Sequence, residues 1–313
     1  MSSHILSPSL PLLGETIAGR YLVEREIANS ALCTLYRASD LKRDRVVALR
    51  VFKPLVNPKG AETQAWSGDL EQVGRWASTQ FLPTQDLGVA AEGVAAGRVY
   101  TAEPFVPQAS LDERLKQGAL PADEVMRLGA QLFAALDALH QAGRLHLNLK
   151  PSNVFVSENA FGLSQLVVSG VGKRAFMSFD KASTGESLAT PTYLIPELVL
   201  GEAATPAADI YQAGVLLYEL AVGRPPFSFQ DQRQAARAHL NDNPVHPRLA
   251  NPRAKLSKGL NDLLLQCLSK RPEQRPASAQ EARAQLELLL GEEATSLSAP
   301  LTPLFTPSPA DLS

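Results

Sequence analysis

The residue pattern of this 313-residue chain changes near Pro121, and that change limits the folds open to it. Before it, from Arg20 to about Val106, short runs of β-branched and aromatic residues alternate with turn residues, which is typical of β-strands. These runs are YLVEREI, LCTLYRAS, RVVALRVF and GRVYTAEPF. After Pro121, apolar residues recur every three or four positions, which indicates helices. A strand-rich part followed by a helix-rich part predicts an α+β protein with two lobes.

The helical pattern is clearest in four segments of the second part. They are residues 121–143, ending at Gly143, then 209–222, 259–268 and 279–290. A further helix is predicted within the strand-rich part, at 63–77. We expect residues 1–18 to be a flexible arm, 19–106 the smaller lobe, 107–291 the larger lobe and 292–313 a disordered Ser/Thr/Pro-rich tail.

Composition excludes several classes of function. The net charge is −2, without the basic excess that attracts nucleic acid, so we expect no nucleic-acid partner. The two cysteines, Cys33 and Cys267, lie far apart and fit no zinc-site spacing. With no disulfide framework suggested, we expect a cytoplasmic protein. No apolar run reaches the roughly 20 residues that span a bilayer, so we expect no direct membrane insertion.

Several short segments of the second part follow one another in a distinctive order. They are RLHLNLKPSNVFV (His146 to Asn153 within it), ATPTYLIPE (Ala189 to Glu197), DIYQAGVLLYEL from Asp209, GRPPF from Gly223 and RPEQRP with Arg275. In this order they resemble the eukaryotic-like, Hanks-type Ser/Thr protein kinase domain of bacterial type. The resemblance extends from Tyr21 to about Leu290. It implies the bilobal kinase fold, with a small β-rich N-lobe and a larger helical C-lobe.

The resemblance assigns structural roles to three charged residues. Glu197 and Arg275 would form a buried ion pair that joins two segments of the larger lobe. Asp209 would accept backbone hydrogen bonds beneath the loop that contains His146. Because a buried charge that loses its partner costs roughly 3–5 kcal/mol, we expect these residues to serve folding.

The residues that would contact nucleotide phosphates have changed. The family's three loop glycines, which let the backbone approach phosphate, fall on Ala28, Ser30 and Cys33. The family's phosphate-binding lysine falls on Arg50, which keeps the charge but not the compact ammonium. Arg50 could pair with an acidic residue of the smaller lobe's helix, and Asp69 and Glu71 are both open as that partner.

The resemblance places the catalytic aspartate of the family on Asn148, between Leu147 and Leu149. An amide can hydrogen-bond a hydroxyl group but cannot take its proton. His146 and Lys150 of the same loop are retained, whereas Leu147 replaces the arginine that binds a phosphorylated activation loop. We therefore expect neither base catalysis nor that form of regulation.

The metal-binding aspartate of the family falls on Val168, followed by Ser169 and Gly170. An aliphatic side chain offers magnesium no oxygen ligand. Asn153, the second metal ligand of the family, is present, but a lone neutral amide is a poor site and loop hydrogen bonding explains its retention as well. We predict no metal and no required cofactor.

The sequence leaves two alternatives for the cleft between the lobes. The family's gatekeeper position is assigned to Ala102, before Phe105 of the connection between the lobes, and its small side chain would leave room for adenine. ATP could then bind weakly without magnesium, against Ala28, Ser30, Cys33, Arg50, Ala102 and Phe105. Alternatively, Arg50 and Val168 project into the cleft and fill it, which is the alternative we favour.

The pattern as a whole predicts a pseudokinase that acts as a regulatory or scaffolding module in Ser/Thr phosphorylation signalling. The alternative is a divergent active kinase that transfers the ATP γ-phosphate to protein. Partners would be an active kinase, a phosphatase or a phosphothreonine-binding domain, the last recognising phosphorylated Thr302 and Thr306 of the tail. The weaker candidates for phosphorylation are Ser183, Thr184, Thr190 and Thr192.

Overall fold

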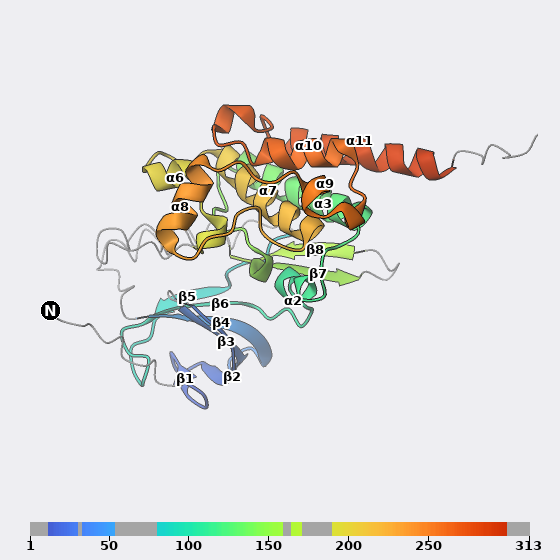
Figure 1. The fold of residues 1–313 in the computed structure, drawn as a ribbon. Coiled ribbons are helices and arrows are strands. Elements are labelled where there is room, and N and C mark those ends of the chain that lie inside the picture. The colour runs from blue at the N-terminus through green and yellow to red at the C-terminus, as the bar shows by residue number, and fades with distance from the viewer. Residues whose placement is uncertain (1–11, 31–32, 54–79, 159–163, 171–189, 299–313) are drawn as a thin grey trace, which may run out of the picture.

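The computed structural model describes residues 12–30, 33–53, 80–158, 164–170 and 190–298, which form two lobes (Figure 1). The smaller lobe is one antiparallel sheet in the order β1-β2-β3-β4-β6-β5. Its strands are Thr16–Ile17 (β1), Tyr21–Asn29 (β2), Cys33–Asp40 (β3), Arg45–Phe52 (β4), Asp86–Val89 (β5) and Val99–Pro104 (β6). The four strands expected from the sequence are confirmed, and β1 and β5 are additional.

Alternation along the strands divides the sheet into two faces. One face carries an apolar core that includes Tyr36, Val47, Leu49, Tyr100 and Ala102. Because side chains of a strand point alternately to opposite faces, the residues between these ones lie on the other face.

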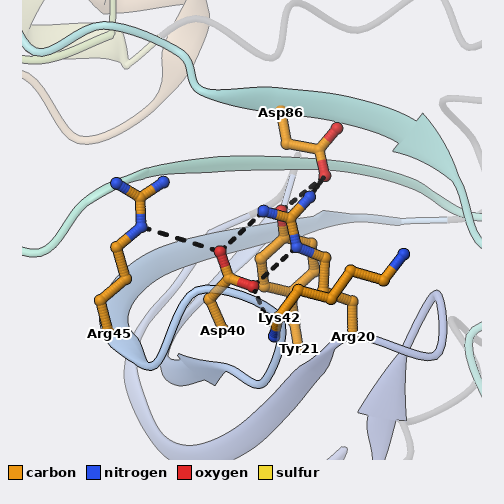
Figure 2. A network of polar contacts seen from close by, with 6 residues as sticks. All are labelled: Arg20, Tyr21, Asp40, Lys42, Arg45 and Asp86. Carbon is orange, nitrogen blue, oxygen red and sulfur yellow. Dashed lines mark hydrogen bonds and ion pairs between the residues drawn. The ribbon is translucent and has the colours of Figure 1, made fainter.

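A polar network ties the ends of three strands of the smaller lobe together (Figure 2). Asp40 at the end of β3 accepts two hydrogen bonds from the Arg20 guanidinium, each 2.7 Å long. Asp86 of β5 accepts from Arg20 at 2.9 Å and from the Tyr21 hydroxyl at 2.5 Å. The guanidinium holds the pKa of the fully buried Asp40 carboxyl at about 2.

The larger lobe is mainly helical, with a two-stranded sheet facing the smaller lobe (Figure 1). Its longer helices are Ala122–Gln141 (α3), Pro206–Val222 (α7), Gln232–Asn241 (α8), Lys258–Cys267 (α10) and Ala279–Ser298 (α11). Short helices are Leu111–Leu115 (α2), Pro196–Leu200 (α6) and Pro247–Ala250 (α9), with 3-10 turns at Pro151–Asn153 (η1), Pro191–Tyr193 (η2), Pro252–Ala254 (η3) and Pro272–Gln274 (η4). Strands Val154–Glu158 (β7) and Ser164–Val168 (β8) form the small sheet. Helix α7 is buried along almost its whole length and forms the centre of this lobe.

The four long helices expected in the larger lobe are confirmed, with shifts of one to a few residues at their ends for α3, α7 and α10. Helix α8 was missed, although Asp231 provides an N-cap signal by accepting from the Gln234 N–H at 2.7 Å. The helix expected at 63–77 lies outside the described residues.

Both ends of the predicted lobes need correction. Residues 12–18 are not part of a loose arm, because Leu12 is buried in the core of the smaller lobe and β1 pairs with β2. The expected disordered tail begins too early, because helix α11 continues from Ala279 to Ser298. Thr302 and Thr306 lie outside the described residues, as do Ser183 and Thr184.

Among the described residues, no helix combines the length and the apolar character needed to cross a bilayer.

Candidate functional site

The central loop, residues 144–150 between α3 and η1, is anchored by a buried carboxylate of α7. Asp209 Oδ2 accepts the backbone N–H of His146 at 2.8 Å, and Oδ1 accepts that of Leu147 at 2.7 Å. The His140 ring lies against the same carboxylate, with Nε2 2.8 Å from Oδ2. Asp209 thus has the backbone partners expected from the resemblance, and it fixes the path of the central loop.

Leu147 has an unusual backbone for its residue type. Its φ is +56°, in the left-handed region that leucine rarely adopts. Its side chain is 4% exposed and packs in one apolar cluster with Ile195 and Ala208. At the position where the resemblance expects a phosphate-binding arginine, an apolar contact therefore links the central loop to the start of α6.

The two asparagines of the site are joined by a hydrogen bond. Asn153 Nδ2 donates to the carbonyl oxygen of Asn148 at 2.8 Å, and the Asn148 N–H donates to His146 Nδ1 at 3.2 Å. Asn153 is 3% exposed. Its amide nitrogen closes the central loop. This is the structural role that the sequence analysis offered, beside metal binding, as a reason for the presence of Asn153.

Lys150 extends from the end of the central loop toward Thr190. Its Nζ donates to Thr190 Oγ1 at 3.3 Å. Burial, and next the positive charge of Arg50, lower the pKa of Lys150. Arg50 of the smaller lobe is thus close enough to Lys150 of the larger lobe for the two positive charges to repel each other.

Val168 is a core residue and does not project into the cleft as we expected. It is fully buried among the apolar side chains of the larger lobe, opposite Val154 of β7. Its backbone N–H donates to Gln80 O, and its carbonyl oxygen accepts from the Leu82 N–H, both at 2.8 Å. The position expected to hold a metal ligand is built into the apolar core.

The two residues that follow Val168 connect it to the central loop. The Ser169 N–H donates to Asn153 O at 2.8 Å, and His146 Nε2 lies 3.2 Å from Ser169 O. Gly170 has a φ of +93°, a conformation that favours glycine. These contacts place residues 168–170 beside the central loop.

The turn between β2 and β3 uses its own polar groups internally. Ser30 Oγ donates to Cys33 O at 2.8 Å and accepts from the Cys33 N–H at 3.1 Å. The Ser30 N–H donates to Cys33 O at 3.0 Å. Ala28 remains paired with Leu35 in the ladder. Where the resemblance expects glycines whose N–H groups approach phosphate, two of the N–H groups are already engaged.

The gatekeeper assignment to Ala102 is wrong. Ala102 is opposite Leu49 in the ladder and belongs to the apolar core on the face away from Arg50. The residues of β6 on the same face as Arg50 are Thr101 and Glu103. Glu103 is 2% exposed, with Oε2 3.5 Å from Arg50 Nη2. Asp69 and Glu71, the two open partners for Arg50, lie outside the described residues.

Phe105 follows β6 at the edge of the same face. The Arg37 guanidinium lies 5.7 Å from the centre of its ring, which is within range of a cation–π contact. Arg37 is opposite Ala48 in the ladder, so a further cationic side chain covers this end of the sheet.

These residues do not fit a magnesium nucleotide complex. Magnesium prefers oxygen ligands, but Val168 has none, so the amide oxygen of Asn153 is the only side-chain oxygen that these two positions could offer, since its amide nitrogen is bonded within the central loop. Among the residues that the structure describes, no three His, Cys, Asp or Glu side chains come together as a metal site.

The ion pair between Glu197 and Arg275 is present and buried. The two Arg275 nitrogens lie 2.8 and 3.0 Å from the two Glu197 oxygens. The guanidinium also donates to the carbonyl oxygens of Ser269, Ala207 and Lys270. Arg275 therefore joins α6, the start of α7 and the segment after α10.

Sequence reasoning missed two residues that organise the site. Gln212 of α7 accepts the Leu149 N–H at 3.0 Å and donates to Tyr193 O at 2.8 Å, so it joins the central loop to η2. The second is Glu103, to which the sequence analysis gave no role. Period-two alternation in β6 separates Glu103 from Ala102, but the register of β6 against β4 cannot be read from the sequence.

Comparison with known proteins agrees with this architecture. The family described as "Protein kinase domain" matches residues 89–286. The kinase domain of Mycobacterium tuberculosis PknI has a similar fold, with a TM-score of 0.68 at 22% identity, covering 90% of this chain and 100% of that one.

Similar curated proteins are Ser/Thr protein kinases of bacteria. The chain is 29% identical over 294 residues to serine/threonine-protein kinase pkn3 of Myxococcus xanthus, covering 92% of this chain and 53% of that protein. It is 28% identical over 275 residues to serine/threonine-protein kinase PknD of M. tuberculosis, covering 88% of this chain and 40% of that protein. The chain thus spans about half the length, or less, of these relatives.

Proposed function

We propose that this chain, which belongs to the protein kinase domain family, is a pseudokinase that acts by binding other proteins and does not transfer phosphate. The observation that carries the proposal is the chemistry of two positions in an otherwise ordered site. Asn148 stands where a base is required, and Val168 stands where a metal ligand is required. Both positions are held in place by hydrogen bonds or core packing.

The chemical consequence at Asn148 is the loss of proton transfer. Its amide can accept a hydrogen bond from an alcohol, but it cannot remove the proton as the alcohol attacks phosphorus. Loss of a general base removes a factor of roughly 10²–10⁴ in rate. The lost metal ligand acts on the same step, so the two factors are not independent.

The consequence at Val168 is structural as well as chemical. An aspartate there would replace a side chain that is fully buried against apolar neighbours. A buried unpaired carboxylate is strongly disfavoured, so restoring the family's residue does not restore the site.

The surface that would dock a protein substrate in the family is ordered without that chemistry. Gln212 binds Tyr193 O, the Tyr193 hydroxyl hydrogen-bonds Glu219, and Leu147 packs against Ile195. These contacts require no phosphate group on the activation segment. They support a role in which residues 190–200 present a fixed surface to a protein.

The partner is proposed to be an active Ser/Thr kinase or a phosphatase, working in the cytoplasm. The relatives are named Ser/Thr protein kinases, which supports a partner from Ser/Thr phosphorylation signalling. A phosphothreonine-binding domain would be a third kind of partner if Thr302 or Thr306 carries phosphate in the cell.

A labelled-phosphate assay tests the proposal. The purified chain, with ATP labelled at the γ-phosphate, magnesium or manganese and a Ser/Thr peptide mixture, is expected to transfer no label. Asn148→Asp, Val168→Asp and the double variant are also expected to transfer none, because Val168 lies in the core. Transfer by the wild-type chain that is lost in Asn148→Ala would overturn the proposal and establish a divergent active kinase.

The binding role has its own measurement. In native cells, crosslinking from residues 190–200 is expected to recover a Ser/Thr kinase or phosphatase, and addition of the purified chain is expected to change that enzyme's rate. If the recovered enzyme keeps the same rate with and without the chain, the regulatory part of the proposal fails.

A further inference from the structure

The inner face of the smaller lobe, defined as Ala48, Arg50, Thr101 and Glu103, is set by the register of two strands. Residues directly opposite in an antiparallel ladder share a face. Arg50 is opposite Thr101, and Ala48 is opposite Glu103. Leu49, which lies between the two β4 residues, is opposite Ala102 and belongs to the apolar core of the other face.

The inner face looks toward the larger lobe. The charge of Arg50 contributes to lowering the pKa of Lys150, which lies in the central loop of the larger lobe. Figure 1 shows β4, β5 and β6 as the part of the sheet nearest the larger lobe, with β1 farthest away. The inner face therefore borders the space between the lobes.

Two of the four side chains of the inner face, Arg50 and Glu103, are charged. Arg50 Nη2 and Glu103 Oε2 are 3.5 Å apart, and the two side chains are 12% and 2% exposed. A carboxylate buried to this degree needs its cation, because an unpaired buried charge is strongly unfavourable. A flat ring that entered here would have to separate the pair or displace Glu103.

Some of the neighbouring backbone groups cannot donate to such a ring. Pro104, the last residue of β6, has no N–H to donate. Between β2 and β3, the Ser30 and Cys33 N–H groups are already bonded to each other's residues.

We infer that the Arg50–Glu103 pair closes the cleft from within, so that adenine nucleotides are excluded by the chain's own side chains. The inference deepens the proposed function and rests on it, since a closed cleft suits a protein that works by binding. It also predicts that removal of one member of the pair increases nucleotide binding. Removing the Glu103 carboxylate makes space at the inner face, and the Arg50 guanidinium can then bind the phosphates of a nucleotide.

Nucleotide binding by the full chain tests this inference. The probe is N-methylanthraniloyl-ATP in buffer with EDTA, followed by fluorescence and by displacement with unlabelled ATP. The wild-type chain is expected to show no saturable binding into the millimolar range. Glu103→Ala, which opens space, is expected to bind about tenfold or more tightly than any residual wild-type signal.

Two further variants keep the test decisive. Glu103→Ser also removes the charge and most of the side-chain volume, and it replaces Glu103→Ala if that variant fails to fold by circular dichroism. Glu287→Ala removes an exposed carboxylate of α11, far from the cleft, and is expected to bind no better than wild type.

A gain of binding in either folded Glu103 variant, and none in Glu287→Ala, supports the inference. Saturable displacement from the wild-type chain at micromolar ATP overturns it, as does the absence of any gain in both folded Glu103 variants. Its failure is separable from that of the proposed function. Wild-type binding without label transfer removes only the closed cleft, whereas label transfer by wild type removes the proposed function as well.

Discussion

The Glu197–Arg275 pair of the larger lobe and the Arg50–Glu103 pair of the smaller lobe are both buried, but they are satisfied to different degrees. Arg275 binds both oxygens of Glu197 and three backbone carbonyl oxygens. Arg50 reaches Glu103 through one 3.5 Å contact, and its Nε has no hydrogen-bond partner among the described residues. The comparison teaches that the Arg275 guanidinium, which joins segments of the larger lobe, is more fully hydrogen-bonded than the Arg50 guanidinium of the smaller lobe.

The largest effect is expected from Arg275→Met, which tests the well-satisfied side of the comparison. It leaves Glu197 buried without its cation and three carbonyl oxygens without their donor. We expect a loss of about 3–5 kcal/mol in the free energy of unfolding, measured by urea denaturation. Arg271→Met, which removes an exposed ion pair with Glu273, is the control and should cost no more than about 1 kcal/mol. Similar losses in both variants would contradict the comparison.

Leu147→Ala tests whether apolar packing holds the central loop at the position where the resemblance expects a charged arginine. The substitution empties part of the cluster with Ile195 and Ala208, so we expect a loss of about 2–4 kcal/mol. Leu200→Ala, on an exposed side chain of α6, serves as the control and should stay within about 0.5 kcal/mol. A near-neutral result for Leu147→Ala would show that the Asp209 hydrogen bonds alone hold the loop.

Asp40→Asn sharpens the comparison in the smaller lobe, where a buried carboxylate is well bonded (Figure 2). We expect a loss of about 2 kcal/mol at neutral pH, because Arg20 keeps Asp86 as a partner.

The pH dependence of this loss has a definite sign. The folded-state pKa of Asp40, about 2, lies below its ordinary value of 3.8, so its stabilisation is complete above about pH 4 and is lost as the pH falls toward 2. The stability difference between wild type and Asp40→Asn should therefore shrink between these pH values. A difference that grows on acidification would contradict the assignment.

The smallest effect is expected when both members of the cleft pair are replaced. Because apolar replacement of a buried ion pair is often neutral, and Arg50 Nε has no partner among the described residues, Arg50→Met with Glu103→Met should change the free energy of unfolding by within about 1 kcal/mol, or stabilise the chain. Glu197→Met with Arg275→Met should remain destabilising, since the three carbonyl oxygens lose their donor in that variant too. Equal costs for the two double variants, measured by urea denaturation, would remove the distinction between the pairs.

Much of the larger lobe could be predicted from the sequence because its signals are local. The helical repeat from Ala122 to Gln141 and the ordered motifs are visible without a structure, and the roles expected of Glu197 and Arg275 follow from them. The ends of the lobes were harder to predict from the sequence. In the sequence Leu12 belongs to a Ser/Pro/Leu-rich arm, and only its packing against the sheet shows that it is core.

The sequence by itself determined which chemical groups are present, and so the absence of carboxylates at positions 148 and 168. It could not determine what faces Arg50. That depends on β6 pairing with β4 across a long intervening segment, and a shift of one residue would exchange Glu103 for Ala102 on the inner face. Tertiary structure likewise decided that Val168 is core and not a cleft residue, because its burial comes from strands and helices distant in sequence.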